Sequence, residues 1–315
     1  MAYYLGIDGG GTKTRCVLGD ETMVLATAMS GGSNMIRLGE AQAREALHTA
    51  IRQVCASANV SPNRIRAICV GGAGAARPEI ADKIRGILAA IIPDVAPARV
   101  EIVGDHEIAL EAAFGAGPGV IAIAGTGSIV YGRDAAGRIA RAGGWGFAIS
   151  DEGSGHWIGR RAISALMSAR DQGLETALTT MILQAWKLST LDELVQQANS
   201  TPPPDFPRLF PIVLRAADEG DSIARALLTD AGVKLANLVS IIACRLALNT
   251  PAAMPAASML PVATLPVAKT GSVFRQSAEV CRVFYDTLQA SMPGLDVRQD
   301  IVDPIEGALA RAKRK

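Results

Sequence analysis

The sequence predicts an α/β protein made of two related domains. Short runs of β-forming apolar residues alternate with longer stretches of helical periodicity, and strands dominate the beginning of the chain while helices dominate the rest. Two strand pairs, at 3–19 and 119–132, each enclose a loop of glycine and threonine. Repetition of the same unit at two distant places indicates a duplicated domain, so we expect two similar domains.

The individual elements follow from these patterns. Strands are expected over 3–8, 14–19, 23–29, 66–71, 99–103, 119–124, 128–132, 138–141, 263–270 and 296–300. Helices are expected over 40–58, 78–91, 105–114, 154–168, 173–186, 190–198, 207–217, 221–248, 272–290 and 304–313. Asp221 is a suitable N-cap for the longest of these helices. The segment 199–207, NSTPPPDFP, is expected to be an exposed loop that moves relative to the core.

The composition indicates a globular protein with ample sequence for a core. The chain has 315 residues, of which 49% are hydrophobic and 19% charged. The formal net charge of +1 gives no electrostatic reason to expect a nucleic-acid partner. The uncharged stretch 246–268 contains several prolines and is expected to be a loop and a strand rather than a membrane helix. No signal peptide precedes the first strand, and we therefore expect a soluble cytoplasmic protein without a membrane partner.

The cysteines predict a reducing compartment. They are Cys16, Cys55, Cys69, Cys244 and Cys281, and no two of them form a CxxC pair. Most stand in apolar runs, as small buried hydrophobic residues do. Zinc or iron–sulfur ligation is therefore not indicated.

The first fourteen residues, MAYYLGIDGGGTKT, carry the strongest local signal. An apolar strand ends in Asp8, and three glycines and Thr12 follow before the next strand. Glycines allow main-chain N–H groups to approach an anion, and an acid beside a phosphate suggests a hydrated Mg²⁺. The lysine of a Walker A loop is replaced by Thr12, and the dinucleotide-binding glycine spacing is absent. An ordinary glycine-rich turn, with Asp8 as a turn acid, is the alternative interpretation.

Five segments in order give this loop a context. They are Asp8–Thr14, the acid of Gly104-Asp105-His106, the loop Gly125–Ser128, the pair Gly271-Ser272, and a small-residue helix near the C-terminus, IEGALA at 305–310. This order resembles that of the actin, hexokinase and heat-shock chaperone superfamily. The segment GGWGFAISDEGSGHWIG at 143–159, with GTGS before it and GDSIARALLTDAG at 220–232, resembles the N-acetylglucosamine kinase family, which includes the ATPase subunits of benzoyl-CoA reductase.

The resemblance implies two ribonuclease-H-like domains of the actin-like ATPase type, with ATP and a sugar in the cleft between them. The N-terminal domain would comprise 1–113 and the C-terminal helix at about 303–315, and the second domain 114–302. Closure of such a kinase brings the sugar hydroxyl to the γ-phosphate and expels water. A homodimer is a further possibility that the resemblance leaves open.

The resemblance also assigns roles to individual residues. Asp105 matches the catalytic aspartate, a general base for the sugar 6-hydroxyl; a helix N-cap is the alternative interpretation of an acid at this position. Asp8 would hold Mg²⁺ through water. ATP would be bound by Gly10, Gly11, Thr12, Thr126, Gly127, Gly271 and Ser272. The sugar would be bound by Asn34, Asp105, Ser128, Gly144, Trp145, Gly146 and Asp151.

Several of these residues have a simpler structural interpretation. Thr12 and Thr126 could be turn residues, Asn34 a loop residue, and Asp151 the N-cap of the helix that begins near Ser154. The amide of Asn34 is expected to donate to one hydroxyl and accept from another. Trp145 is expected to be buried against a neighbour, because exposing an indole in a glycine-rich loop is costly.

The activity implied is ATP-dependent phosphorylation of the 6-hydroxyl of N-acetylglucosamine or glucosamine. One departure leaves the sugar open: Ile129 stands where the animal N-acetylglucosamine kinases have an asparagine after GTGS. Two other functions are the ATPase activator of a reductase, which requires cluster-binding cysteines, and a non-catalytic sugar sensor. The scattered cysteines disfavour the first, and the presence of Asp105 disfavours the second.

Overall fold

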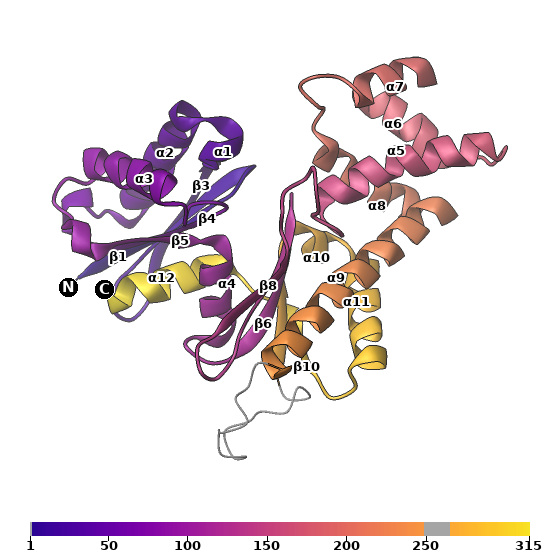
Figure 1. Cartoon of the computed structure of the whole chain (residues 1–315). Helices are drawn as coiled ribbons and strands as arrows, with labels where there is room; N and C mark the ends of the chain where they lie inside the picture. The colour runs from indigo at the N-terminus through magenta and orange to yellow at the C-terminus, as the bar shows by residue number, and fades with distance from the viewer. Residues whose placement is uncertain (1, 249–264) are drawn as a thin grey trace. The chain divides into compact units, whose positions relative to one another are not determined.

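The computed structural model describes residues 2–248 and 265–315. The chain divides into two compact units, and each contains a mixed five-stranded sheet with helices packed on it (Figure 1). Unit 1 consists of Met1–Gly119 and Val302–Lys315, and unit 2 consists of Val120–Ile301.

The two sheets have the same topology. The first contains β1 (Tyr3–Gly9), β2 (Lys13–Gly19), β3 (Val24–Gly31), β4 (Ile65–Gly72) and β5 (Val100–Gly104) in the order β3-β2-β1-β4-β5. The second contains β6 (Gly119–Ala124), β7 (Ser128–Arg133), β8 (Ile139–Gly143), β9 (Pro266–Thr270) and β10 (Asp296–Ile301) in the order β8-β7-β6-β9-β10. In each, the first strand lies beside the second strand of its hairpin and pairs in parallel with the fourth. The predicted α/β fold and its repetition are therefore confirmed.

Helices cover both faces of the first sheet. They are α1 (Met35–Leu38), α2 (Glu40–Ala58), α3 (Pro78–Ile91), α4 (Asp105–Phe114) and α12 (Pro304–Arg314). The larger core lies between the sheet and α2 and α3, and it contains Leu5, Ile7, Ile51 and Ile87. On the other face, α4 and α12 pack together against β1 and β4.

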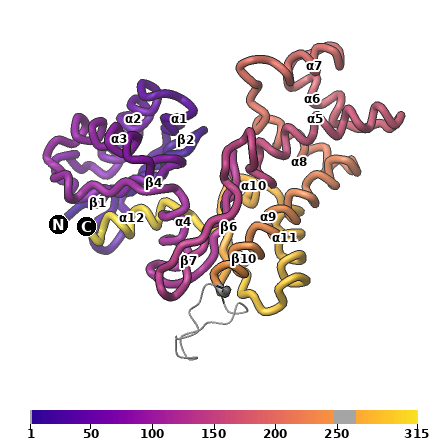
Figure 2. Tube along the Cα trace, in the orientation of Figure 1, coloured from indigo at the N-terminus to yellow at the C-terminus, as the bar shows by residue number. Residues whose placement is uncertain are grey.

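The C-terminal helix belongs to unit 1 because the sequence lets it approach closely (Figures 1 and 2). A side chain at Gly6 would come within 2.6 Å of Leu309 N, and one at Gly307 would collide with the backbone of α4. The close contact is reinforced by an ion pair, 2.8 Å long, between Arg311 of α12 and Glu101 of β5, both largely buried. These contacts join the last residues of the chain to its first strand.

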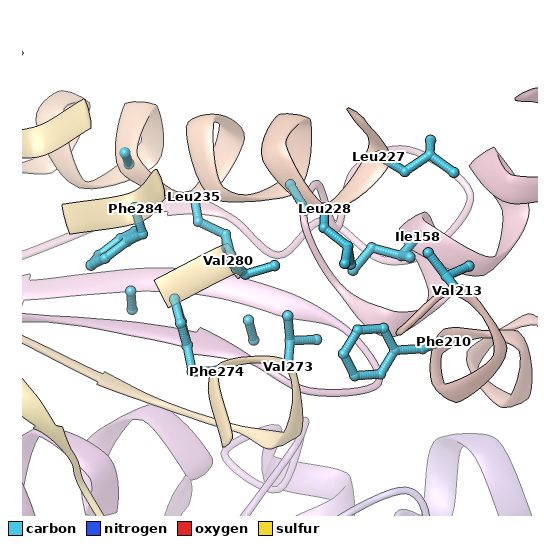
Figure 3. Packing of buried hydrophobic residues seen from close by; sticks show 14 of the residues in the cluster. Ile158, Phe210, Val213, Leu227, Leu228, Leu235, Val273, Phe274, Val280 and Phe284 are labelled. Atoms are coloured by element: carbon cyan, nitrogen blue, oxygen red, sulfur yellow. The ribbon is translucent and has the colours of Figure 1, made fainter. Parts of the chain in front are cut away.

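Unit 2 contains more helix than unit 1. Its helices are α5 (Gly155–Asp171), α6 (Ala177–Trp186), α7 (Leu191–Ala198), α8 (Phe210–Asp218), α9 (Ser222–Leu248), α10 (Ser272–Gln276) and α11 (Ala278–Ser291), with a 3-10 turn at Phe206–Leu209. Figure 3 shows the core, in which Leu235, Phe274, Val280 and Phe284 meet between the sheet and α9 and α11. Within the described residues, one helix segment, Ser222–Leu246, has the length and mean hydropathy (1.5) of a membrane span, and half of it is buried inside the protein.

Some expected elements differ in detail. The helix expected over 272–290 is two helices, because the Ser277 hydroxyl accepts a hydrogen bond from Val280 N (3.2 Å) and starts a new one. The short α1 was not expected. The N-cap role of Asp221 is confirmed, since its carboxylate accepts from Ala224 N at 2.8 Å. Most of the stretch 246–268, expected to be loop and strand, lies outside the described residues.

Candidate functional site

Two acids lie at one edge of the first sheet. Asp8 is the penultimate residue of β1, and Asp105 directly follows β5. The parallel strand β4 lies between them, and the register pairs Gly9 with Gly72 and Gly72 with Gly104. Because neighbouring strands are about 4.8 Å apart, the backbones that carry Asp8 and Asp105 are about 10 Å apart. The strand between them ends in two glycines, so no side chain of that strand fills the space.

Asp105 is the first residue of α4 and not its N-cap. The N-cap is Gly104, whose N–H donates to Glu107 Oε1 at 3.2 Å. One oxygen of Asp105 accepts from His106 N at 3.0 Å, and the side chain is 34% exposed. Because Glu107 satisfies the end of the helix, the alternative interpretation of Asp105 as the cap is wrong. The second oxygen of Asp105 makes no hydrogen bond within the described part of the chain.

The first glycine loop is joined to the segment that carries Asn34. Ser33 N and Asn34 N both donate to Gly10 O, at 3.1 and 3.2 Å. Below them, Thr14 Oγ1 donates to Ser33 Oγ in a buried hydrogen bond of 2.8 Å. The structure therefore brings Asn34 next to Gly10 and Gly11, while Thr12 is exposed at the tip of the hairpin.

Asn34 is the N-cap of α1, which limits what its side chain can do. Its Oδ1 accepts from Ile36 N at 3.0 Å and from Arg37 N at 3.2 Å. These bonds use both lone pairs of the oxygen, so the side chain can donate to a sugar but cannot also accept from it. The expectation that this amide both donates and accepts is therefore wrong.

Arg37 is a residue of this loop that sequence reasoning missed. A methyl group added at Gly11 would lie 3.3 Å from Arg37 Nη1, which places the guanidinium directly beside the first glycine loop. A cation next to a predicted phosphate site is what a polyanion requires. The sequence places Arg37 three residues after Asn34, which could have suggested a role near the site. Its contact with Gly11, however, exists only because α1 turns the chain back toward the loop.

The second glycine loop is bound to the start of α5. Gly155 N donates to Gly125 O at 2.8 Å, and His156 N donates to Thr126 O at 3.1 Å. Gly125 N in turn donates to Gly127 O at 2.9 Å, which closes the loop on itself. The true N-cap of α5 is Ser154, whose hydroxyl accepts from Trp157 N. The position of this loop is therefore fixed by a helix that begins thirty residues later in the sequence — an arrangement no local pattern reveals.

Asp151 lies against this second loop. Its Oδ2 would be 2.9 Å from a methyl group at Gly127, and its carboxylate accepts from Ser128 N. The residue is buried and has a left-handed φ of 74°. Burial raises the pKa of Asp151, the bond from Ser128 opposes that rise, and the charge of Glu152 adds to it. Because Ser154 is the N-cap of α5, the alternative interpretation of Asp151 as that cap is wrong.

The hydroxyl of Ser128 is already committed within the protein. It donates to Glu152 O at 2.7 Å, and Ser128 N is bound by Asp151. Ser128 can therefore only accept a hydrogen bond from a ligand at its oxygen.

Gly271 and Ser272 adjoin the second glycine loop at the end of β9. The strand pairs in parallel with β6, with Ile123 opposite Thr270. Gly271 has a φ of 111°, and a side chain there would collide with the backbone of Ala124. Ser272 Oγ would be 3.9 Å from a methyl group at Gly125. Unit 2 thus brings together the two segments expected to bind the nucleotide.

The segment Gly144-Trp145-Gly146 is held by unusual backbone geometry. Gly143, Gly144 and Gly146 all have left-handed φ values, and a side chain at Gly144 would collide with Ile129. Trp145 is 62% exposed, so the expectation that it is buried is wrong. Three left-handed glycines turn this loop away from the core, and the indole is covered on one face by the guanidinium of Arg141, 3.8 Å from the ring centroid.

Comparisons with known proteins match most of the chain. The model of the BadF/BadG/BcrA/BcrD ATPase family matches residues 5–312. An N-acetylmuramic acid/N-acetylglucosamine kinase of Clostridium acetobutylicum is 36% identical over 245 residues, which are 75% of this chain and 77% of that protein. A glucosamine kinase of Vibrio cholerae is 30% identical over 72% of this chain and 76% of its own. A crystal structure described as a candidate N-acetylglucosamine kinase from Chromobacterium violaceum is 28% identical, with a TM-score of 0.74 and 99% of both chains covered.

Proposed function

Because the chain belongs to the BadF/BadG/BcrA/BcrD ATPase family, we propose that it is an ATP-dependent kinase acting on the 6-hydroxyl of N-acetylglucosamine or glucosamine. The relatives named as kinases of these sugars support the substrate class. The observation that carries the proposal is the edge of the first sheet, where Asp8 near the end of β1 and Asp105 directly after β5 lie on either side of the glycine-ended β4.

Asp105 is assigned the role of general base. One of its oxygens is fixed by His106 N, which orients the carboxylate, and the other can accept the proton of a sugar hydroxyl. It lies in the first turn of α4, where the backbone N–H groups of the helix point toward the site. Removing the proton as the oxygen attacks the γ-phosphate prevents a positive charge from developing on the nucleophile.

The two glycine loops are assigned to the phosphates of ATP. Gly10, Gly11 and Thr12 supply donors from unit 1, and Thr126 and Gly127 supply them from unit 2. Gly271 and Ser272 are assigned to the adenosine, because they adjoin the second loop at the end of β9. Each of these turns contains glycine and few large side chains, so a phosphate could approach its main-chain N–H groups closely.

Magnesium is proposed as the accompanying ion, held by Asp8 through water. Within the described residues there is no group of three or more side chains able to hold a metal. A single carboxylate such as Asp8 suits Mg²⁺, which keeps several waters and is bound by one or two carboxylates together with substrate phosphates. When bound, the ion would neutralise charge on the phosphates, and Asp8 would position it.

The sugar is assigned to Asn34, Asp105, Ser128, Gly144, Trp145, Gly146 and Asp151. The hydrogen bonds in the structure restrict these roles: Asn34 can only donate and Ser128 can only accept. Asp151 is buried beside the second loop and can accept from hydroxyls. The loop at Gly144–Gly146 presents main-chain groups and the exposed indole.

The direct test is a coupled assay of ADP release with N-acetylglucosamine, glucosamine, glucose and N-acetylmannosamine. We expect release that depends on an amino sugar and on Mg²⁺, with ³¹P NMR placing the phosphoryl group on O6. Asp105→Asn is the inactive control. Hydrolysis of ATP that is unaffected by every sugar would contradict the proposal and favour an ATPase activator.

A further inference from the structure

Arg141 is the residue of the sugar loop that the proposed function leaves unexplained. It lies on the edge strand β8 and pairs with Tyr131 of β7. Its Nε is buried and has no hydrogen-bond partner in the part of the chain that the structure describes. A buried polar group without a partner is rare in native proteins and calls for an explanation.

The guanidinium of Arg141 is held in place by stacking rather than by an ion pair. Its Cζ lies 3.8 Å from the centroid of the Trp145 ring, and no ion pair joins it to a carboxylate among the described residues. Stacking fixes the plane of the guanidinium and leaves its terminal N–H groups available as a rigid fork. Such a fork matches the two oxygens of a carboxylate.

The position of Arg141 favours the sugar over the nucleotide phosphates. In the sheet register, Ile129 pairs with Gly143 and Tyr131 with Arg141, so these four residues share one face of the β7–β8 hairpin. Ile129 also packs against Gly144, a residue assigned to the sugar. Along β7, Tyr131 lies about 10 Å from Ser128 and from the phosphate loop before it. The guanidinium of Arg141 therefore lies beside the proposed sugar-binding loop at Gly144 and Trp145 rather than beside the phosphate loop.

We propose that Arg141 is a specificity-determining residue that binds a carboxylate carried by the amino sugar, with the indole of Trp145 holding the guanidinium in place. This inference rests on the proposed kinase function and deepens it. The substrate class is an amino sugar with an acidic substituent, in addition to the neutral amino sugars. The terminal N–H groups of a guanidinium held flat against an indole, with no carboxylate of the described residues beside it, suit a counter-ion that the substrate supplies.

The test compares an acidic with a neutral amino sugar in the full-length protein. N-acetylmuramic acid is the acidic probe, and N-acetylglucosamine and glucosamine are the neutral ones. For Arg141→Gln we expect kcat/KM for the acidic probe to fall about 10- to 100-fold, the usual value of one charge-assisted hydrogen bond. The loss should appear mainly in KM, and both the neutral sugars and the KM for ATP should change little.

Matched variants separate charge from structure. Arg133→Gln removes a cation from the same face of the same hairpin, opposite Ile139, and should leave the preference unchanged. Arg141→Lys keeps the charge but loses the flat fork, and should recover only part of the activity with the acidic probe. Melting temperatures of all three variants show whether folding is retained.

Three results would overturn the inference. One is that the wild type phosphorylates neutral amino sugars but neither binds the acidic probe in calorimetry nor phosphorylates it. Another is that Arg141→Gln lowers kcat/KM equally for both kinds of sugar, which would indicate a structural role. The third is a raised KM for ATP alone, which would assign the cation to phosphate. Failure of the kinase function itself is distinct, because no sugar would then be phosphorylated.

Discussion

Replacing Asp105 by asparagine should remove turnover and leave the fold intact. The substitution keeps the shape of the side chain and an oxygen that can accept from His106 N, but it removes the ability to take up a proton. We expect kcat to fall by about 100- to 10,000-fold, the usual contribution of a general base. The amide cannot substitute for the carboxylate, so raising the pH should not restore activity.

The cost in stability follows from the position of Asp105 in α4. A negative charge in the first turn of a helix contributes about 0.3–1 kcal/mol, and this is what the asparagine variant loses. For a domain of about 150–250 residues each kcal/mol shifts the melting temperature by about 2–4 °C, so the expected decrease is a few degrees at most. Circular dichroism melting measures this decrease.

Glu107 provides the matched control, because it is also an acid in the first turn of α4. Its carboxylate accepts from Gly104 N at 3.2 Å and lies 3.6 Å from a guanidinium nitrogen of Arg311, so it supports the end of the helix. Glu107→Gln should lower the melting temperature at least as much as Asp105→Asn and retain most of kcat. Near wild-type turnover in folded Asp105→Asn would refute the assignment of Asp105 as general base. An equal loss of kcat in both variants would show that turnover depends on the structure of the helix end and not on proton transfer to Asp105.

Three further substitutions have defined outcomes. Burial raises the pKa of Asp151 in the folded protein. The ionised carboxylate therefore lowers the stability of the fold above this raised pKa, and has no such effect below the pKa of the unfolded chain, about 4. Asp151→Asn should melt no lower than the wild type at pH 8, and calorimetry should show that it binds the sugar more weakly. Gly271→Ala would place a side chain at a φ of 111° and against the backbone of Ala124. It should lower the free energy of unfolding in urea by about 2 kcal/mol or more and raise the KM for ATP. An unchanged urea midpoint would show that the end of β9 relaxes to accept the methyl group. Burial raises the pKa of the Asp221 carboxyl, but the hydrogen bonds from Ala224, Thr176 and Ala177 outweigh burial and lower it. The carboxylate therefore stabilises the fold at neutral pH, and this stabilisation is lost as the pH falls through the lowered pKa. Asp221→Ala should cost about 0.5–2 kcal/mol of unfolding free energy at pH 7 and less in acid, and a cost independent of pH would contradict this assignment.

At Asp105, Asp151 and Asn34, prediction from sequence is limited by competition among nearby hydrogen-bonding groups. Asp105 and Asp151 both stand where a helix could need a cap, and sequence patterns cannot tell which of several polar residues will provide it. In the structure Gly104 with Glu107 serves α4, and Ser154 serves α5. The two aspartates therefore keep carboxylate oxygens for other partners. Conversely, Asn34 was expected to be available and is instead used by α1.

Exposure of Trp145 illustrates a second limit. Its apolar ring predicted burial, but three glycines with left-handed φ values direct the loop outward, and Arg141 covers the ring from a neighbouring strand. Neither the backbone conformation of consecutive glycines nor the approach of Arg141 can be read from composition. Arg37 beside Gly11 was missed for the same reason, since both contacts depend on how a turn closes.

The two repeated strand pairs, their glycine loops and the family could be predicted from sequence patterns, because apolar alternation and glycine-rich turns act over short distances. Tertiary structure alone decided which acids keep a free oxygen, how α5 fixes the second loop, and where Arg141 lies. Those outcomes depend on groups that are distant in the sequence and meet only when strands take their register and helices pack against them.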